Sequence, residues 1–254
     1  MLQDASVLFG VDLVSGSERV DWDRMRASGR TFAYAQAGSR DFAETWEAMR
    51  TAGILRGAWH LLRDDEPAIE QAIRFLRQVE LQPGDLPPAL DITAIGERSP
   101  WSVGEMMRAW LGVVESELEA RHGHAPRPII RTHDRAWRHH RDLDHHAVWV
   151  IDHAQYDRRD GEWMFHQYAG ATPGMPDTGS CRFDRFNAIK LGDRGKHVAR
   201  LKQRLGETRF RFGITETDVL DPPTRDAIVR FQASRELLQD GIVGPKTYAE
   251  LEWS

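Results

Sequence analysis

Short apolar runs alternate with longer amphipathic stretches along most of the chain. Residues 7–12 form the run Val-Leu-Phe-Gly-Val-Asp, whose length and composition are typical of a buried strand. In residues 66–79, apolar residues recur at helical spacing and give a helix one apolar face. The same two patterns predict strands at 7–12, 31–35, 55–60, 88–92, 127–132 and 147–151, and helices at 21–28, 41–52, 66–79 and 103–120.

This alternation of strand and helix defines the expected fold class. Strands that are separated by helices pair in parallel, because each helix carries the chain back across the sheet. The predicted strands are too many for a small open sheet, so we expect an α/β fold with a β/α (TIM-like) barrel. In such barrels the functional residues gather at the carboxyl ends of the strands.

The last part of the chain has a different pattern. It predicts short helices at 198–205, 223–234 and 246–251, with no strand between them. Residues 217–224 and 240–247 resemble each other, and each is a turn with proline just before a helix. We therefore expect a small all-α domain at 188–254, after a barrel at 1–187.

Composition excludes several classes of protein. With 41% hydrophobic and 29% charged residues, the 254-residue chain is ordinary for a globular protein. Its net charge of -5 argues against a nucleic-acid partner, and no apolar run approaches the ~20 residues that would predict membrane insertion. Cys181 is the only cysteine, so an internal disulfide is excluded, and residues 1–4 lack the basic start of a signal peptide.

A series of motifs runs through residues 1–187. They are Phe9–Asp12, Val20–Trp22, Gly29–Tyr34, Phe42–Trp46, Ala52–His60, Asp85–Asp91, Arg127–Ile130, Val148–Trp149, His166–Tyr168 and Phe186–Asn187. In this order and spacing they resemble glycoside hydrolase family 25, the muramidases of the Chalaropsis lysozyme type. The resemblance implies a flattened β/α barrel that cleaves peptidoglycan between N-acetylmuramic acid and N-acetylglucosamine, without a cofactor.

Residues 188–254 carry a second set of motifs. They are Leu191–Gly195, Val198–Lys202, Ala227–Gln232 and Asp240–Thr247. These motifs resemble the three-helix peptidoglycan-binding domain, which implies noncovalent binding to the bacterial cell wall. The two resemblances together predict that peptidoglycan glycan strands are the partner of this protein.

Cleavage of a glycosidic bond usually needs two carboxyl groups, one of them a protonated acid. The resemblance places Asp12 and Asp91 at two of the family's acidic positions. Asp12 ends an apolar strand, where a charge is costly unless it is paired or functional. Residues two apart in a strand face the same side, so we expect Asp91 and residue 93 both to face the cleft.

Two positions depart from the family pattern. Thr93 stands where the family has its glutamate general acid, and a hydroxyl cannot act as that acid near neutral pH. Arg182 stands where the family has a further aspartate. Two other acids are candidate replacements: Glu97, on a loop six residues past Asp91, and Asp184, two residues after Arg182.

Aromatic residues at predicted strand ends suit a saccharide cleft, because sugar rings stack on aromatic faces. The aromatic candidates are Tyr34, Trp59, Trp149 and Tyr168. The polar candidates for substrate binding are His60, Thr93, Gln167 and Arg182. Residues 139–146 contain four histidines, but their spacing fits no zinc motif, so we predict no metal site.

These observations leave three hypotheses. The leading one is a lysozyme-like protein that binds the cell wall without efficient hydrolysis. The alternative is an active N-acetylmuramidase, an endolysin or effector, that uses Glu97 or Asp184 as its acid. A third is an interaction protein that binds another protein through the barrel surface. A wall-directed protein made in the cytoplasm would reach the wall after release or delivery by another system.

Overall fold

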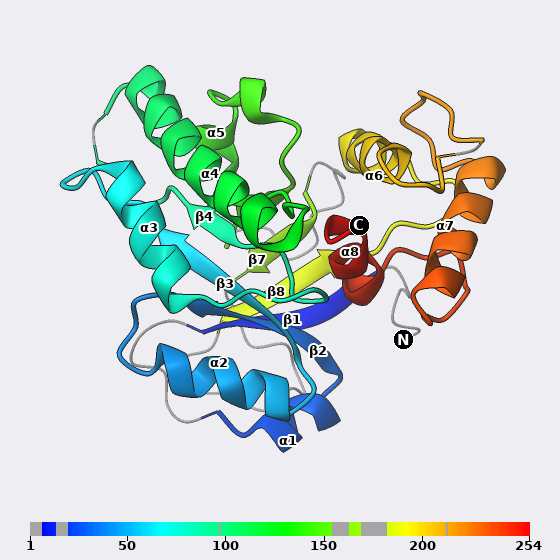
Figure 1. Ribbon diagram of the computed structural model, residues 1–254, viewed down its shortest axis with the longest axis horizontal. Helices are drawn as coiled ribbons and strands as arrows, with labels where there is room; N and C mark the ends of the chain where they lie inside the picture. Colours follow the sequence, from blue (N-terminus) through cyan, green and yellow to red (C-terminus); the bar gives the residue numbers. More distant parts are fainter. Residues whose placement is uncertain (1–6, 14–19, 97, 154–162, 169–181, 212) are drawn as a thin grey trace.

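The computed structural model describes residues 7–13, 20–96, 98–153, 163–168, 182–211 and 213–254 (Figure 1). The strands in these ranges are β1 (Val7–Leu13), β2 (Arg30–Gln36), β3 (Leu55–Leu61), β4 (Ala89–Asp91), β5 (Ile129–His133), β6 (Val148–Ile151), β7 (Phe165–Tyr168) and β8 (Arg182–Asn187). The helices are α1 (Trp22–Ala27), α2 (Phe42–Thr51), α3 (Ala68–Gln78), α4 (Pro100–His122), α5 (Asp134–Trp137), α6 (Lys196–Gly206), α7 (Pro222–Ser234) and α8 (Pro245–Glu252), with a 3-10 turn at Arg141–Leu143.

The strands close into a barrel in sequence order, which confirms the predicted architecture. Strands β1 to β7 pair in parallel, but β8 runs antiparallel to both β7 and β1. Parallel pairing holds for the six predicted strands, and β8, which was not among them, runs the other way. An antiparallel neighbour needs no crossover helix, so strand–helix alternation gives no sign of this direction.

The two faces of the barrel strands have different neighbours. Outward apolar side chains pack beneath the helices, with α3 and α4 covering one side and α1 and α2 lying on another (Figure 1). Inward side chains form an aromatic core in which the Phe165 ring lies 5.5 Å from the rings of both Phe32 and Tyr34. Glycines make room for these rings, since a Cβ atom at Gly10 or Gly57 would overlap Phe32 or Tyr34.

The C-terminal helices pack onto the amino-terminal end of this barrel. Tyr248 of α8 is buried, and its ring lies 5.7 Å from Phe186 and 6.4 Å from Phe165. The interior of the barrel and the core of the helical part therefore form one continuous apolar cluster. The boundary at 187/188 stays a prediction, and the two parts share a core across it.

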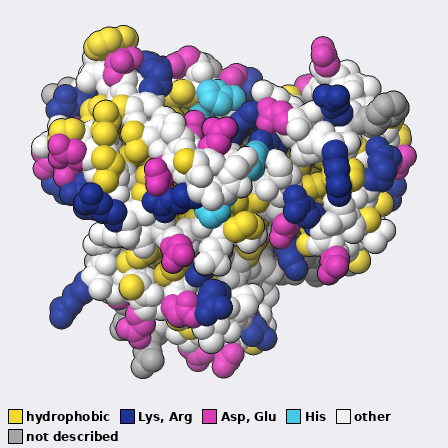
Figure 2. Space-filling view, in the orientation of Figure 1, with side chains coloured by type: hydrophobic (Ala, Val, Ile, Leu, Met, Phe, Trp, Pro, Cys, Tyr) yellow, Lys and Arg dark blue, Asp and Glu magenta, His cyan; other side chains and the backbone are white. Residues whose placement is uncertain are grey.

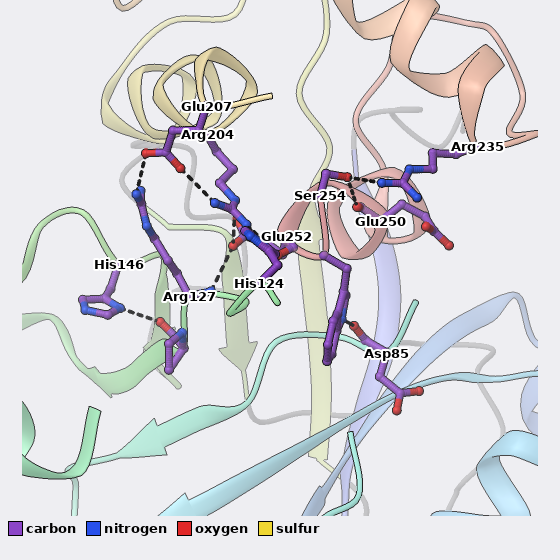
Figure 3. Close-up of polar contacts among 12 residues, drawn as sticks. Asp85, His124, Arg127, His146, Arg204, Glu207, Arg235, Glu250, Glu252 and Ser254 are labelled. Atoms are coloured by element: carbon purple, nitrogen blue, oxygen red, sulfur yellow. Dashed lines mark hydrogen bonds and ion pairs between the residues drawn. The ribbon is translucent and has the colours of Figure 1, made fainter. Parts of the chain in front are cut away.

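Polar contacts frame the same junction (Figure 3). The Arg127 backbone N–H donates to Glu252 Oε2 at 3.2 Å, and its guanidinium pairs with Glu207 Oε1 at 2.5 Å. Arg204 Nη2 donates to the Glu252 carbonyl at 2.7 Å, and Trp253 Nε1 donates to the Asp85 carbonyl at 2.8 Å. These bonds satisfy buried polar groups at the base of the barrel, as a stable contact requires.

His146, beside this junction, is buried and neutral at physiological pH. Its Nδ1 lies 2.8 Å from the Pro128 carbonyl oxygen (Figure 3). Burial lowers the pKa of His146 to about 3, and the neighbouring His145 acts in the same direction. The Nε2 atom lies 3.9 Å from Glu115 Oε1.

The free energy of unfolding should fall by about 2 kcal/mol between pH 7 and pH 5 because of His146. The unfolded chain takes up this proton near pH ~6.5, whereas the folded protein binds it only at much lower pH, so acid favours unfolding. His146→Asn keeps a donor for Pro128 without the titration. Urea unfolding at both pH values should show a smaller loss in the variant, and equal losses would contradict this account.

Candidate functional site

One guanidinium organises the carboxyl end of the barrel. Arg131 of β5 donates from Nη2 to Asp12 Oδ2 at 2.8 Å and from Nη1 to Asp91 Oδ2. It also donates from Nη2 and Nε to Gln167 Oε1 at 2.6 and 3.2 Å. Gln167 Nε2 in turn donates to Asp12 Oδ2 at 3.3 Å. Four strands thus contribute to one buried hydrogen-bonded cluster.

Two tryptophans flank this cluster. The Arg131 guanidinium carbon lies 4.4 Å from the ring centre of Trp59 and 4.9 Å from that of Trp149. Both distances are within the range of cation–π attraction. Burial by itself would lower the pKa of Arg131, but the charges of Asp12, Asp91 and Asp184 outweigh it and raise that pKa above its usual value. Arg131 is therefore a permanent cation at this site.

Several residues singled out from the sequence meet here. Asp12, Asp91 and Gln167 bond to Arg131, while Trp59 and Trp149 lie against its guanidinium.

Asp184 lies two strand residues deeper in the barrel than Asp12, at the level of Gln167. Its backbone pairs in register with Gly10 and Gln167, whereas Arg182 pairs with Asp12 at the carboxyl end. The Asp184 side chain is fully buried, so its carboxylate acts on the cluster through its charge.

Three other candidates do not contact Arg131 directly, although the Tyr34 ring lies 4.8 Å from that of Trp149. Tyr34 is fully buried in the barrel core, where its hydroxyl donates to the Pro87 carbonyl at 2.9 Å. His60 faces the helices: its ring stacks on Trp110 and its Nε2 lies 3.0 Å from Gln71 Oε1. Tyr168 is likewise buried, with the Arg185 guanidinium 4.9 Å from its ring centre. Each of these side chains is engaged in packing.

The chain turns immediately after β4, which ends at Asp91. The Asp91 Oδ1 atom accepts the Thr93 backbone N–H at 2.8 Å, an Asx-type contact that favours a turn. Residue 93 lies in the turn, so strand alternation does not determine which way its side chain faces, and its place at the site stays a prediction. Glu97 and the Arg182 side chain lie outside the described part of the structure.

Arg131 is the site residue that the sequence analysis missed. The signal was present, because Arg131 directly follows the apolar pair Ile129 and Ile130 and is the one charged residue of the stretch Ile129–Thr132. Strand alternation puts Arg131 on the same face as Ile129, which lies in the barrel interior. A charge on an inward face indicates a partner of opposite charge.

The rest of the described surface and the histidine run add no further site of this kind. Lys and Arg side chains are interspersed with Asp and Glu over the face in Figure 2. Within the described ranges, no three His, Cys, Asp or Glu side chains are grouped to hold a metal ion. None of the helices described combines the length and apolar character needed to cross a membrane.

Comparison with protein families now assigns the barrel. The model of glycosyl hydrolases family 25 matches residues 11–175, and that of the peptidoglycan binding domain matches residues 194–251. The chain belongs to glycosyl hydrolase family 25, and its family barrel is followed by a peptidoglycan-binding domain.

Solved structures agree with the fold. The lysozyme of Streptomyces coelicolor is 23% identical, with a TM-score of 0.57 over 72% of this chain and 94% of its own. A family 25 glycosyl hydrolase of Bacillus anthracis is 21% identical, with a TM-score of 0.55 over 70% of this chain and 88% of its own.

Among sequence relatives, the uncharacterized protein YegX of Escherichia coli O157:H7 is 29% identical over 202 residues, which is 72% of this chain and 71% of that protein.

Proposed function

We propose that this protein binds bacterial cell wall through both domains, and that its family 25 barrel recognises glycan strands without efficient hydrolysis. The observation that carries the proposal is the bonding of Arg131 to both Asp12 and Asp91. A glycosidase needs a carboxyl group that carries a proton and directs it at the leaving oxygen. The carboxyl groups held here serve as acceptors for a permanent cation.

The surroundings of Asp91 support this proposal. One of its oxygens accepts from Arg131 and the other accepts the Thr93 backbone N–H, so neither presents an O–H to a substrate. The hydroxyl of Thr93 cannot replace a carboxylic acid in proton transfer. General acid–base catalysis contributes about 10²–10⁴-fold to a rate, so its loss would leave binding as the main property of the site.

Sedimentation with purified sacculi tests the proposal directly. The full chain should appear in the pellet, and mass spectrometry of the soluble fraction should detect no released muropeptides. Hen lysozyme on the same sacculi provides the positive control for release.

Two results would contradict the proposal in different ways. Soluble disaccharide muropeptides with new muramic acid reducing ends, absent with Asp91→Asn, would establish an active muramidase with a rearranged acid. If the protein stays in the supernatant and releases no product, the proposed wall-binding function itself is wrong.

A further inference from the structure

A pocket of about 680 Å³ lies where the base of the barrel meets the C-terminal domain. From the barrel it is lined by the amino-terminal ends of the first three strands, including Leu8, Thr31 and Leu55. From the C-terminal domain it is lined by the segment between α7 and α8 and by the start of α8. Its volume is in the range of small-molecule sites, and neither domain forms it alone.

The lining of this pocket suits an aliphatic ligand. Leu8, Leu55 and Ile242 contribute to its walls, and none of the described residues that line it is aromatic. Leu238, which also lines the pocket, is 78% exposed. A sugar ring would find no stacking partner here, whereas small methyl-bearing side chains would be well accommodated.

Backbone strain occurs at the edge of the same pocket. Glu236 has φ 56°, a conformation that residues other than glycine rarely adopt, directly before Leu237 and Leu238. The Leu237 N–H donates to the Gln232 carbonyl, and Gln232 Oε1 accepts the Gly241 N–H, each at 2.9 Å. These bonds hold the segment after α7 in a fixed shape. Strain that is held by surrounding bonds is common at ligand sites.

Among the described residues that line the pocket, one cation, Lys246, and one carboxylate, that of Asp240, have no ion pair. Arg56 is paired with Asp85 at 2.8 and 3.1 Å, and Arg50 is paired with Glu47. Asp240 Oδ1 accepts from Gln232 Nε2 and from the Ile242 N–H.

Lys246 is exposed at the start of α8 and has no ion pair with any residue of the described ranges. Lys246 and Asp240 thus offer the pocket one positive and one negative charge, so a ligand that complements it carries an anionic and a cationic group next to small apolar groups.

We propose that this pocket binds the peptide part of peptidoglycan, a short peptide with small apolar side chains and free carboxylates. The inference rests on the proposed function, since it names a second component of the same wall polymer. The pocket lies at the opposite end of the barrel from Arg131: Leu8 precedes Asp12 by four strand residues, about 13 Å. The protein then contacts glycan at one end and peptide at the other, and gains affinity from two linked sites.

Calorimetric titration of the full chain with the synthetic peptide L-Ala–γ-D-Glu–L-Lys–D-Ala–D-Ala tests the proposal. Lys246→Glu should weaken peptide binding at least tenfold, and Thr31→Trp should do the same by filling the pocket from an exposed strand position. Lys196→Glu makes the same charge change in the same domain but outside the pocket, so its affinity should equal that of the wild type.

A chemically modified ligand gives a second control. The peptide with both carboxyl groups amidated should bind the wild-type protein as weakly as the free peptide binds Lys246→Glu. Equal peptide affinity in the wild type and both pocket variants, or no heat of binding at millimolar peptide, would overturn the proposal. If the same preparation binds no peptide but still sediments with sacculi, only the peptide-site proposal is wrong and the proposed wall-binding function stands. If it does not sediment, the proposed function fails as well.

Discussion

Arg131→Met is expected to lower the free energy of unfolding by about 3–5 kcal/mol. The substitution removes the cation from a cluster in which Asp12 and Asp91 are almost fully buried. A buried carboxylate that loses its partner keeps its full desolvation cost. Urea unfolding at pH 7 measures the effect.

The triple variant Arg131→Met, Asp12→Asn, Asp91→Asn is the matched control. It removes both charges together with their partner, so it should recover more than half of the lost stability. A loss below about 1 kcal/mol in the single variant would mean that the carboxylates are solvated. The interpretation of these residues as a buried, charge-compensated cluster would then be wrong.

Tyr248→Ala should destabilise the barrel as well as the C-terminal domain, by about 3–5 kcal/mol in a single unfolding transition. The ring of Tyr248 fills the base of the barrel against Phe165 and Phe186, and its removal leaves a cavity in the shared core. Hydrogen exchange of peptides from β5 and from α7 should report the same loss. Tyr248→Phe retains the ring and should cost far less.

A different result for Tyr248→Ala would contradict the shared core. If α7 exchanges faster while β5 keeps its wild-type protection, the barrel folds independently of the C-terminal helices. Two separate transitions in urea would lead to the same conclusion. The continuous apolar cluster would then be a contact between two stable domains.

The placement of the candidate site residues depended on how far each strand could be followed in the sequence. Asp12 and Trp149 lie in strands that the sequence predicted, because both strands are continuous apolar runs. Thr93 was placed on a strand face, but the Asp91 side chain accepts the Thr93 N–H and the strand ends there. A local side-chain bond of this kind competes with strand geometry and leaves no periodic signal.

Tyr34, His60 and Tyr168 show a second limit. Each falls in a strand that the sequence predicts or that matches a family motif, and each is aromatic or polar enough to bind a sugar. Whether such a side chain meets solvent or the core depends on barrel closure and on the depth of the residue along the strand. His60 contacts Gln71 and Trp110 from two helices, and no local pattern predicts those contacts.

The sequence by itself determined the alternation of strands and helices, the barrel, the helical C-terminal part and the family motifs. Hydrophobic periodicity and motif spacing are local properties, so they can be recognised from the sequence alone. Only the tertiary structure brought Arg131 between Asp12 and Asp91, from positions up to 119 residues apart. It alone decided that Tyr248 closes the base of the barrel and that a pocket forms between the domains. These features arise from packing between distant segments, which closure of the barrel and docking of α8 create together.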